Sequence, residues 1–164
     1  MNLLLGSLSN NFQNKLSIPV NSSAATIQND DSGVIRMVVS NGSEDGVNGK
    51  IRFEFLNGAT AAQPIVLNYS LAGSALSSGL DADYTADFPS SITIPAGASF
   101  AEITLNVIND TRIEDIETVE VIGLALDVAY PGISLDPARP ILNISDNDQA
   151  ELVLAGPPSV LEGN

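Results

Sequence analysis

The stretch SITIPAGASFAEITLNVINDT, residues 91–111, contains two short runs in which apolar and polar residues alternate. The first run is SITI at residues 91–94, and the second is AEITLNVI at residues 101–108. Alternation with a period of two predicts β-strands that bury one face. The residues between them, PAG at 95–97, have the composition of a turn. The stretch therefore predicts a β-hairpin that runs directly into acidic residues.

The same alternation is found on both sides of this stretch. It occurs in IRFEF (51–55), IVLNYSL (65–71), TVEVIGLAL (118–126) and PILNIS (140–145). Turn-forming residues separate these runs, and no window of helical length keeps an apolar stripe. We therefore predict an all-β fold made of two stacked sheets.

An internal repeat divides the chain. A shift of 117 residues places residues 4–6 on 121–123, residues 16–18 on 133–135 and residues 29–31 on 146–148, with no gap. Apolar positions and turns agree, which predicts a tandem repeat. Residues 1–31 would be the C-terminal strands of one repeat, 32–148 a complete repeat, and 149–164 the first strand and turn of the next. The short connections between these units predict a semi-rigid rod.

Composition narrows the possible partners. The chain has 20 Asp and Glu residues against 6 Lys and Arg residues, a net charge of -14, and neither His nor Cys. This charge disfavours nucleic acid and anionic membranes as partners. An excess of oxygen ligands without nitrogen or sulfur ligands favours Ca2+ over zinc, copper or iron. No apolar run approaches the roughly 20 residues of a membrane helix, so direct membrane insertion is not expected.

Four ordered motifs within residues 32–148 carry a family resemblance. They are DADYTAD (81–87), the stretch quoted above, EDIET (114–118) and ISDND (144–148), and SVLEGN (159–164) looks like the opening turn of a next copy. With these motifs the unit resembles a Calx-beta domain, known from sodium-calcium exchangers, integrin β4 and large bacterial surface proteins. The resemblance implies an immunoglobulin-like Greek-key β-sandwich of about seven strands. It also implies Ca2+ binding by loops gathered where the chain exits.

The acid-rich turns agree with this geometry. In a Greek-key sandwich, the turns after the first, third and fifth strands lie at the same pole as the C-terminus. Those turns carry EDG (44–46), DADY (81–84) and NDTRIEDIE (109–117), and the exit carries DND (146–148). Four acid clusters that are distant in sequence are thus expected to meet at one pole. There a divalent ion would relieve their mutual repulsion.

The resemblance also implies a set of Ca2+ ligands. Carboxylates would come from Asp83, Asp110, Glu114, Glu117, Asp146 and Asp148, and Arg112 would offer only its backbone carbonyl. The first turn would supply Glu44 or Asp45, because the repeat favours Asp45 and the family's preference for Glu favours Glu44. Asn109 and Asn147 stand where many family members have Asp, which keeps an oxygen ligand but removes charge.

These features together predict a non-catalytic Ca2+-binding structural repeat that forms a stiff stalk or filament of an extracellular, cell-surface adhesin. Its partners would be Ca2+, neighbouring repeats of the same chain and other copies in a filament. Two alternatives are a Ca2+-sensing regulatory module of a membrane protein and a fibre subunit that pairs by exposed strand edges. Catalysis is not expected in a chain without His, Cys or Trp. The export signal is expected to lie outside these residues.

Overall fold

The computed structural model describes residues 32–88, 90–153 and 155–156, which form ten β-strands and one 3-10 helix. The elements are β1 (Gly33–Ser40), β2 (Gly42–Ser43), β3 (Gly49–Phe55), η1 (Leu56–Gly58), β4 (Ile65–Ala72), β5 (Tyr84–Ala86), β6 (Ser91–Ile94), β7 (Phe100–Val107), β8 (Glu117–Leu126), β9 (Ile133–Leu135) and β10 (Leu142–Ser145). The predicted preceding repeat, residues 1–31, lies outside the described residues, as do residues 154 and 157–164 of the predicted following repeat. Across the described ranges, no helix has the length and apolar character needed to cross a membrane.

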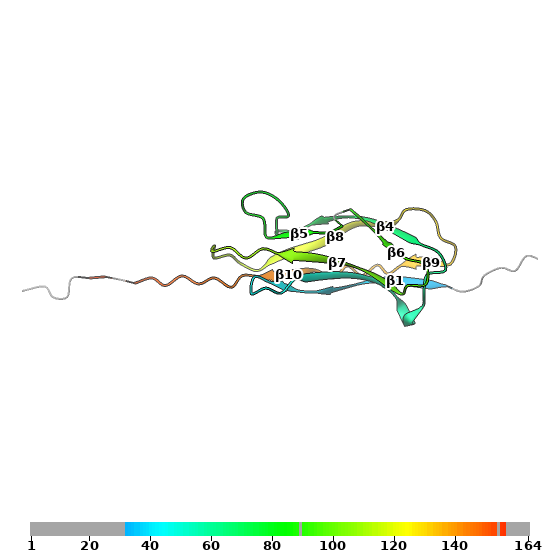
Figure 1. Cartoon of the computed structure of the whole chain (residues 1–164), viewed down its shortest axis with the longest axis horizontal. Coiled ribbons are helices and arrows are strands. Elements are labelled where there is room, and N and C mark those ends of the chain that lie inside the picture. Colours follow the sequence, from blue (N-terminus) through cyan, green and yellow to red (C-terminus); the bar gives the residue numbers. More distant parts are fainter. Residues whose placement is uncertain (1–31, 89, 154, 157–164) are drawn as a thin grey trace, which may run out of the picture.

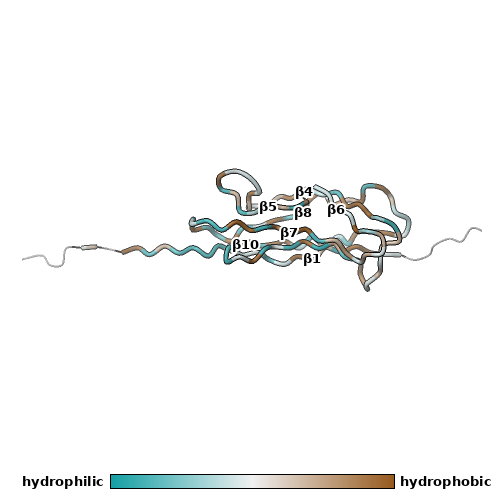
Figure 2. The backbone as a smooth tube through the Cα atoms, in the orientation of Figure 1, coloured by the Kyte–Doolittle hydropathy of each residue, from teal (hydrophilic) through white to brown (hydrophobic). Residues whose placement is uncertain are grey.

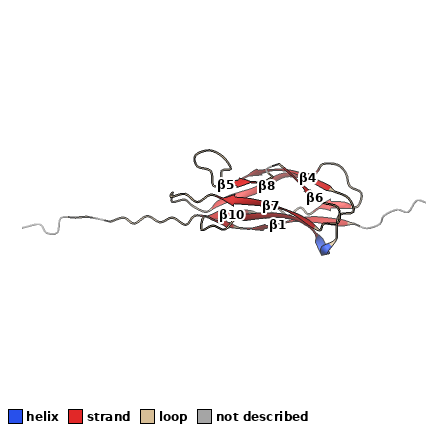
Figure 3. Cartoon of the chain, in the orientation of Figure 1, coloured by secondary structure: helices blue, strands red, loops and turns tan. Residues whose placement is uncertain are grey.

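The strands form two five-stranded sheets that lie face to face (Figure 1, Figure 3). One sheet has the order β5-β7-β3-β1-β9, and the other has the order β2-β10-β8-β4-β6. Neighbouring strands are antiparallel, except that β1 pairs with β9 and β2 with β10 in parallel. The predicted all-β sandwich is thus confirmed.

Alternation along the strands places the core between the sheets. In β3, Ile51 and Phe53 are fully buried, whereas Lys50 and Arg52 lie on the outer face of the sheet. Phe53 packs on Tyr69 of the opposite sheet, with 5.7 Å between ring centroids. Figure 2 shows the hydrophobic stretches along the strands of the body. The period-two pattern therefore arises as predicted, because each sheet buries one face against the other sheet.

The strand count also agrees with the prediction of about seven. β2, β5 and β9 contain only two or three residues each, and seven longer strands remain. The six segments predicted from alternation correspond to β3, β4, β6, β7, β8 and β10. The alternation does not single out β1, because residues 37–39 form an apolar run, MVV.

The prediction of a β-hairpin at residues 95–97 is wrong. β6 pairs with β4 in one sheet, whereas β7 pairs with β3 and β5 in the other. The turn itself forms, since the Ala98 N–H donates to the Pro95 carbonyl at 3.0 Å. It carries the chain from one sheet to the other, because Ile94 and Ile103 are both fully buried and enter the core from opposite sheets.

The chain enters and leaves the domain at opposite ends of its long axis (Figure 1). β1 begins at one end, where the Gly33 N–H donates to the Gly132 carbonyl at 2.8 Å. Residues 146–153 leave beyond β10 at the other end. The connections β2–β3, β4–β5 and β7–β8 also lie at this second end. We call the two ends the entry pole and the exit pole.

Candidate metal centre

The β2–β3 turn brings one acid of the exit pole inward. The Glu44 N–H donates to the Ser145 carbonyl at 3.0 Å, which ties this turn to the end of β10. The turn is closed by the Ser43 N–H, which donates to the Val47 carbonyl at 2.8 Å. Glu44 is only 5% exposed, whereas its neighbour Asp45 is exposed. Of the two residues left open by the sequence, the structure therefore turns Glu44 toward the other acids.

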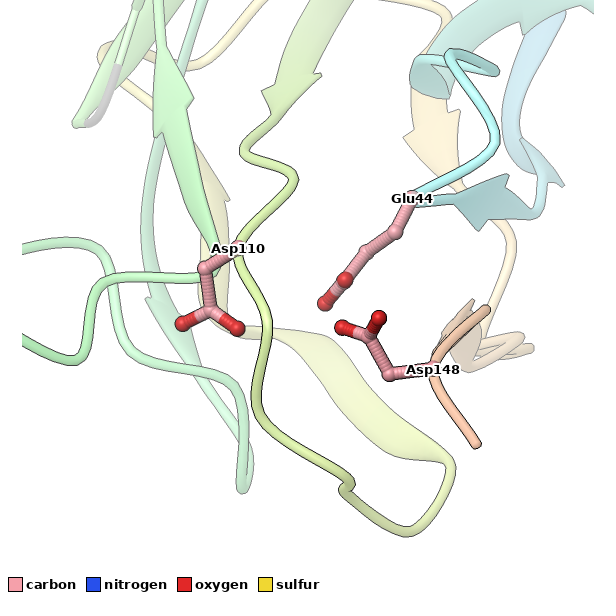
Figure 4. Close-up of side chains that lie close together, drawn as sticks. All are labelled: Glu44, Asp110 and Asp148. Carbon is pink, nitrogen blue, oxygen red and sulfur yellow. The ribbon is translucent and has the colours of Figure 1, made fainter. Parts of the chain in front are cut away.

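Three side chains from separate segments converge in a first cluster, Glu44, Asp110 and Asp148. Each offers a carboxylate oxygen, and these oxygens lie within 4.8 Å of one another. Figure 4 shows the three carboxylates directed toward a common space. Glu44 Oε2 and Asp148 Oδ2 are buried and have no hydrogen-bond partner among the described residues. Buried anionic oxygens without partners are unfavourable, and a cation between them would remove that cost.

A second cluster contains Asp83, Glu114 and Glu117, whose oxygens also lie within 4.8 Å of one another. Asp83 is 7% exposed and accepts a hydrogen bond from the Leu76 N–H at 2.5 Å. Its backbone carbonyl accepts from the Ile108 N–H at 2.8 Å, which fixes the end of the β4–β5 connection against β7. The β7–β8 loop and the start of β8 supply the two glutamates. Both clusters therefore draw on the β7–β8 loop.

Asp146 links the two clusters through the backbone. One of its carboxylate oxygens accepts from the Glu114 N–H and the other from the Asp148 N–H, both at 2.9 Å. These hydrogen bonds, the one from Glu114 first, hold the pKa of Asp146 below its usual range. Asp146, predicted as a ligand, thus accepts a backbone hydrogen bond from a member of each cluster and positions both segments.

The remaining predicted residues surround the clusters. The Asn109 side-chain amide donates to the Glu44 carbonyl at 2.7 Å, which positions the turn. Asn147 is half-buried between the two exit acids. The Arg112 side chain pairs with Asp81, and its Nε lies 3.7 Å from Glu114 Oε1. These ion pairs of the Arg112 guanidinium were not predicted. The only sign of them in the sequence is the position of the arginine among the acids of NDTRIEDIE.

Burial and mutual repulsion raise the pKa values of three carboxyls at this pole. Burial raises the pKa of Glu44, and neighbouring carboxylates raise it further against a backbone hydrogen bond that lowers it. Burial and the charge of Asp83 raise the pKa of Glu114. Burial, with a hydrogen bond and charge from Asp83, raises the pKa of Glu117 to about 7. The acids of the exit pole therefore resist being ionised together.

Glu117 makes the stability of the metal-free domain depend on pH. Its pKa rises from 4.5 to about 7 on folding, so between these values the folded protein holds a proton that the unfolded chain has lost. We expect the melting temperature in chelator to fall from about pH 5 to about pH 8. Ca2+ affinity should rise over the same window, because the ion displaces the proton. Melting curves and calorimetric titrations measure the two trends, and a metal-free melting temperature that climbs through this window would contradict the assignment.

The chemistry and spacing of both clusters fit Ca2+. Oxygens bound to one Ca2+ at 2.3–2.6 Å can be at most about 5 Å apart. All the ligand oxygens of each cluster satisfy this limit. The sites contain only oxygen donors, which Ca2+ prefers over softer ligands. One ion would be held by the first cluster, and the second cluster offers an equivalent set of carboxylates.

Comparison with known proteins supports the fold. No family model matches the chain, and no curated protein matches its sequence. The structure of CBD12 from CALX1.2 matches with a TM-score of 0.50 and 21% identity, covering 70% of this chain and 45% of that chain. The described domain has a Calx-beta-like fold. The resemblance predicted from sequence is thus confirmed in the architecture.

Two further solved structures match the Calx-beta-like domain. The apo form of the Calx CBD1 domain is 19% identical, with a TM-score of 0.47, over 70% of this chain and 98% of that chain. The calcium binding domain CBD12 of CALX1.1 is 16% identical, with a TM-score of 0.42, over 71% of this chain and 42% of that chain. This chain thus spans less than half of either CBD12 structure and nearly all of CBD1.

Proposed function

We propose that the Calx-beta-like domain binds Ca2+ through its two carboxylate clusters and is a non-catalytic unit of an extracellular structural array. The observation that carries the proposal is a pair of buried oxygens, Glu44 Oε2 and Asp148 Oδ2, in a cluster of three acids. Neither oxygen has a hydrogen-bond partner in the part of the chain that the structure describes. A divalent cation satisfies both oxygens and cancels charge that the domain otherwise holds at a cost. Ion binding would therefore be coupled to the stability of the fold.

The position of the clusters supports a structural role. They lie at the exit pole, and Asp148 lies three residues beyond β10, the last described strand. If another unit follows, as the 117-residue repeat predicts, the ion lies at the joint between two sandwiches. It would cancel like charges there and restrict the angle between units, which gives a stiff cell-surface stalk or filament.

Regulation by Ca2+ is the second candidate, and the fold shared with CBD12 from CALX1.2 supports it. The same ion at the same joint could change the angle between domains of a membrane protein. The two roles need different affinities. Extracellular modules bind Ca2+ with Kd of about 10⁻⁴ to 10⁻³ M, and sensors with about 10⁻⁷ to 10⁻⁵ M.

Isothermal titration of the full chain with CaCl2, after dialysis against chelator, tests this proposal. We expect saturable binding, with a Kd in the range of extracellular modules. Glu44→Gln should weaken binding by at least about tenfold, because it removes a buried anionic ligand of the first cluster. Asp45→Asn removes the same charge from the adjacent, exposed position and should leave the affinity within about twofold. Absence of saturable binding by the unmodified chain would refute Ca2+ binding, and equal losses in the two variants would refute the assigned site.

A further inference from the structure

The metal centre does not explain two exposed isoleucines of the exit pole. Ile113 and Ile116 are 58% and 68% exposed, in a loop that is otherwise mostly polar. Each directly precedes a glutamate of the second cluster, Glu114 or Glu117. We call these two residues the isoleucine pair. Two large β-branched side chains exposed three residues apart in a charged loop offer apolar surface that another molecule can cover.

A mostly apolar pocket, which could receive isoleucine side chains, lies at the opposite end of the domain. It has a volume of about 350 Å³, and its apolar lining comes from Phe55, Ala61, Ile65, Tyr130, Pro131 and Ile133. We call it the entry pocket, because Ser32 and Gly33, where the chain enters the domain, also line it. Among the described residues, none that lines the pocket carries a charge, in a protein whose net charge is -14. The lining itself therefore offers apolar surface without like charge, and an acid beside it, Asp127, accepts a hydrogen bond from the Tyr130 hydroxyl at 2.8 Å.

The placement of the two surfaces makes them complementary between copies. One lies at the exit pole and the other at the entry pole, at opposite ends of the long axis (Figure 1). Within one domain they cannot touch. When one domain follows another along this axis, the exit pole of the first faces the entry pole of the second. A contact of this kind uses two different surfaces and is heterologous.

We propose that the isoleucine pair of one domain docks into the entry pocket of a second copy of the domain, head to tail. The proposal rests on the proposed function, because it names the surfaces that meet at the joint of the array. Both isoleucines neighbour carboxylates of the second cluster, so an ion held there fixes the loop that presents them. Docking is therefore strengthened by Ca2+, and the joint combines an ionic part with an apolar part.

Sedimentation velocity of the full chain over a range of concentrations tests the contact. With CaCl2 we expect self-association that increases with concentration, and with chelator we expect mainly monomer. The double variant Ile113→Ser/Ile116→Ser should weaken association by at least about tenfold, since it removes apolar surface from the interface. At concentrations where both chains are monomeric, its Ca2+ titration should match that of the unmodified chain, because neither chain then docks. The matched control Ile122→Ser/Ile141→Ser alters two exposed isoleucines away from both surfaces and should associate normally.

A complementary variant places a charge at the pocket. Ala62 is an exposed lining residue, and Ala62→Asp should block docking by repelling the acidic loop. Ala125→Asp, at an exposed position on β8, is its control. An equal mixture of the double isoleucine variant and Ala62→Asp retains one intact pocket and one intact loop, so it should form dimers and nothing larger.

The outcomes separate this contact from the metal site. If the unmodified chain binds Ca2+ but stays monomeric, or if the double isoleucine variant associates as before, the contact is refuted and the metal site stands. A mixture of the blocked variants that stays monomeric also refutes the contact. If the chain does not bind Ca2+ at all, the proposed function fails. Association that persists in chelator, and that still depends on the isoleucine pair and Ala62, supports the contact and removes its link to the ion.

Discussion

Saturating CaCl2 is expected to raise the melting temperature of the full chain by about 10 °C relative to chelator. At free Ca2+ of about 100 times Kd, one independent site adds about 2.7 kcal/mol to the free energy of unfolding. In a domain of this size, about 1 kcal/mol shifts the melting temperature by about 4 °C. Two occupied clusters would give a larger shift. The physical source is the set of buried and half-buried carboxylates at the exit pole, whose negative charges a divalent cation neutralises without protonation.

Differential scanning fluorimetry or calorimetry measures this shift, with two controls. MgCl2 should stabilise less than CaCl2, because Mg2+ requires a smaller octahedral site and loses its water reluctantly. Asp45→Asn should keep the full shift, since Asp45 is exposed and lies outside both clusters. Superimposable melting curves in CaCl2 and in chelator would rule out coupling between Ca2+ and folding.

Glu117→Gln is expected to change stability in opposite directions with and without Ca2+. In chelator the variant should melt several degrees above the unmodified chain, because it removes a carboxyl whose pKa burial and Asp83 raise to about 7. In CaCl2 it should melt below the unmodified chain, because the second cluster loses a ligand. The variant should therefore have the higher melting temperature in chelator and the lower one in CaCl2. An ordinary destabilising substitution lowers the melting temperature under both conditions.

Glu120→Gln is the matched control for this prediction. It removes the same charge from the same strand, β8, but Glu120 belongs to neither cluster. Its effects in CaCl2 and in chelator should agree within about 1 °C, as expected for a surface substitution. If Glu117→Gln lowers the melting temperature equally under both conditions, Glu117 is a structural residue and not a ligand.

The sequence predicts the sandwich because each sheet buries one face. In β3 and β6 a buried residue follows every exposed or half-buried one. The alternation of apolar and polar residues in the sequence therefore predicts both strands. It does not reveal β1, where Val38 and Val39 follow Met37 without a polar residue between them. Nor does it show that the turn after β6 changes sheets. Residues 95–97 have the composition of a turn, and that composition does not specify whether the strands on either side pair with each other.

The gathering of acids at the exit pole could also be predicted, because alternate turns of a Greek-key sandwich lie at the same pole as the C-terminus. The choice between Glu44 and Asp45 could not, because the two are adjacent and the turn tied to Ser145 decides which of them faces inward. The division into two clusters also depends on side-chain directions that no spacing specifies. The role of Asp146 as a backbone acceptor follows from hydrogen bonds at 2.9 Å and not from residue type.

The parallel pairing of β2 with β10 determines how the domain would carry a load. β2 belongs to the first strands of the chain and β10 is its last described strand, and the ends pulled by a stretched array lie at opposite poles. Tension along the axis then slides these two strands past each other, so their hydrogen bonds bear the force together in shear and are not opened one at a time. Glu44 follows β2, and Asp148 lies three residues beyond β10. A cation bound between Glu44 and Asp148 would cross-link the ends of the β2–β10 pair and so oppose the sliding of these two strands under tension.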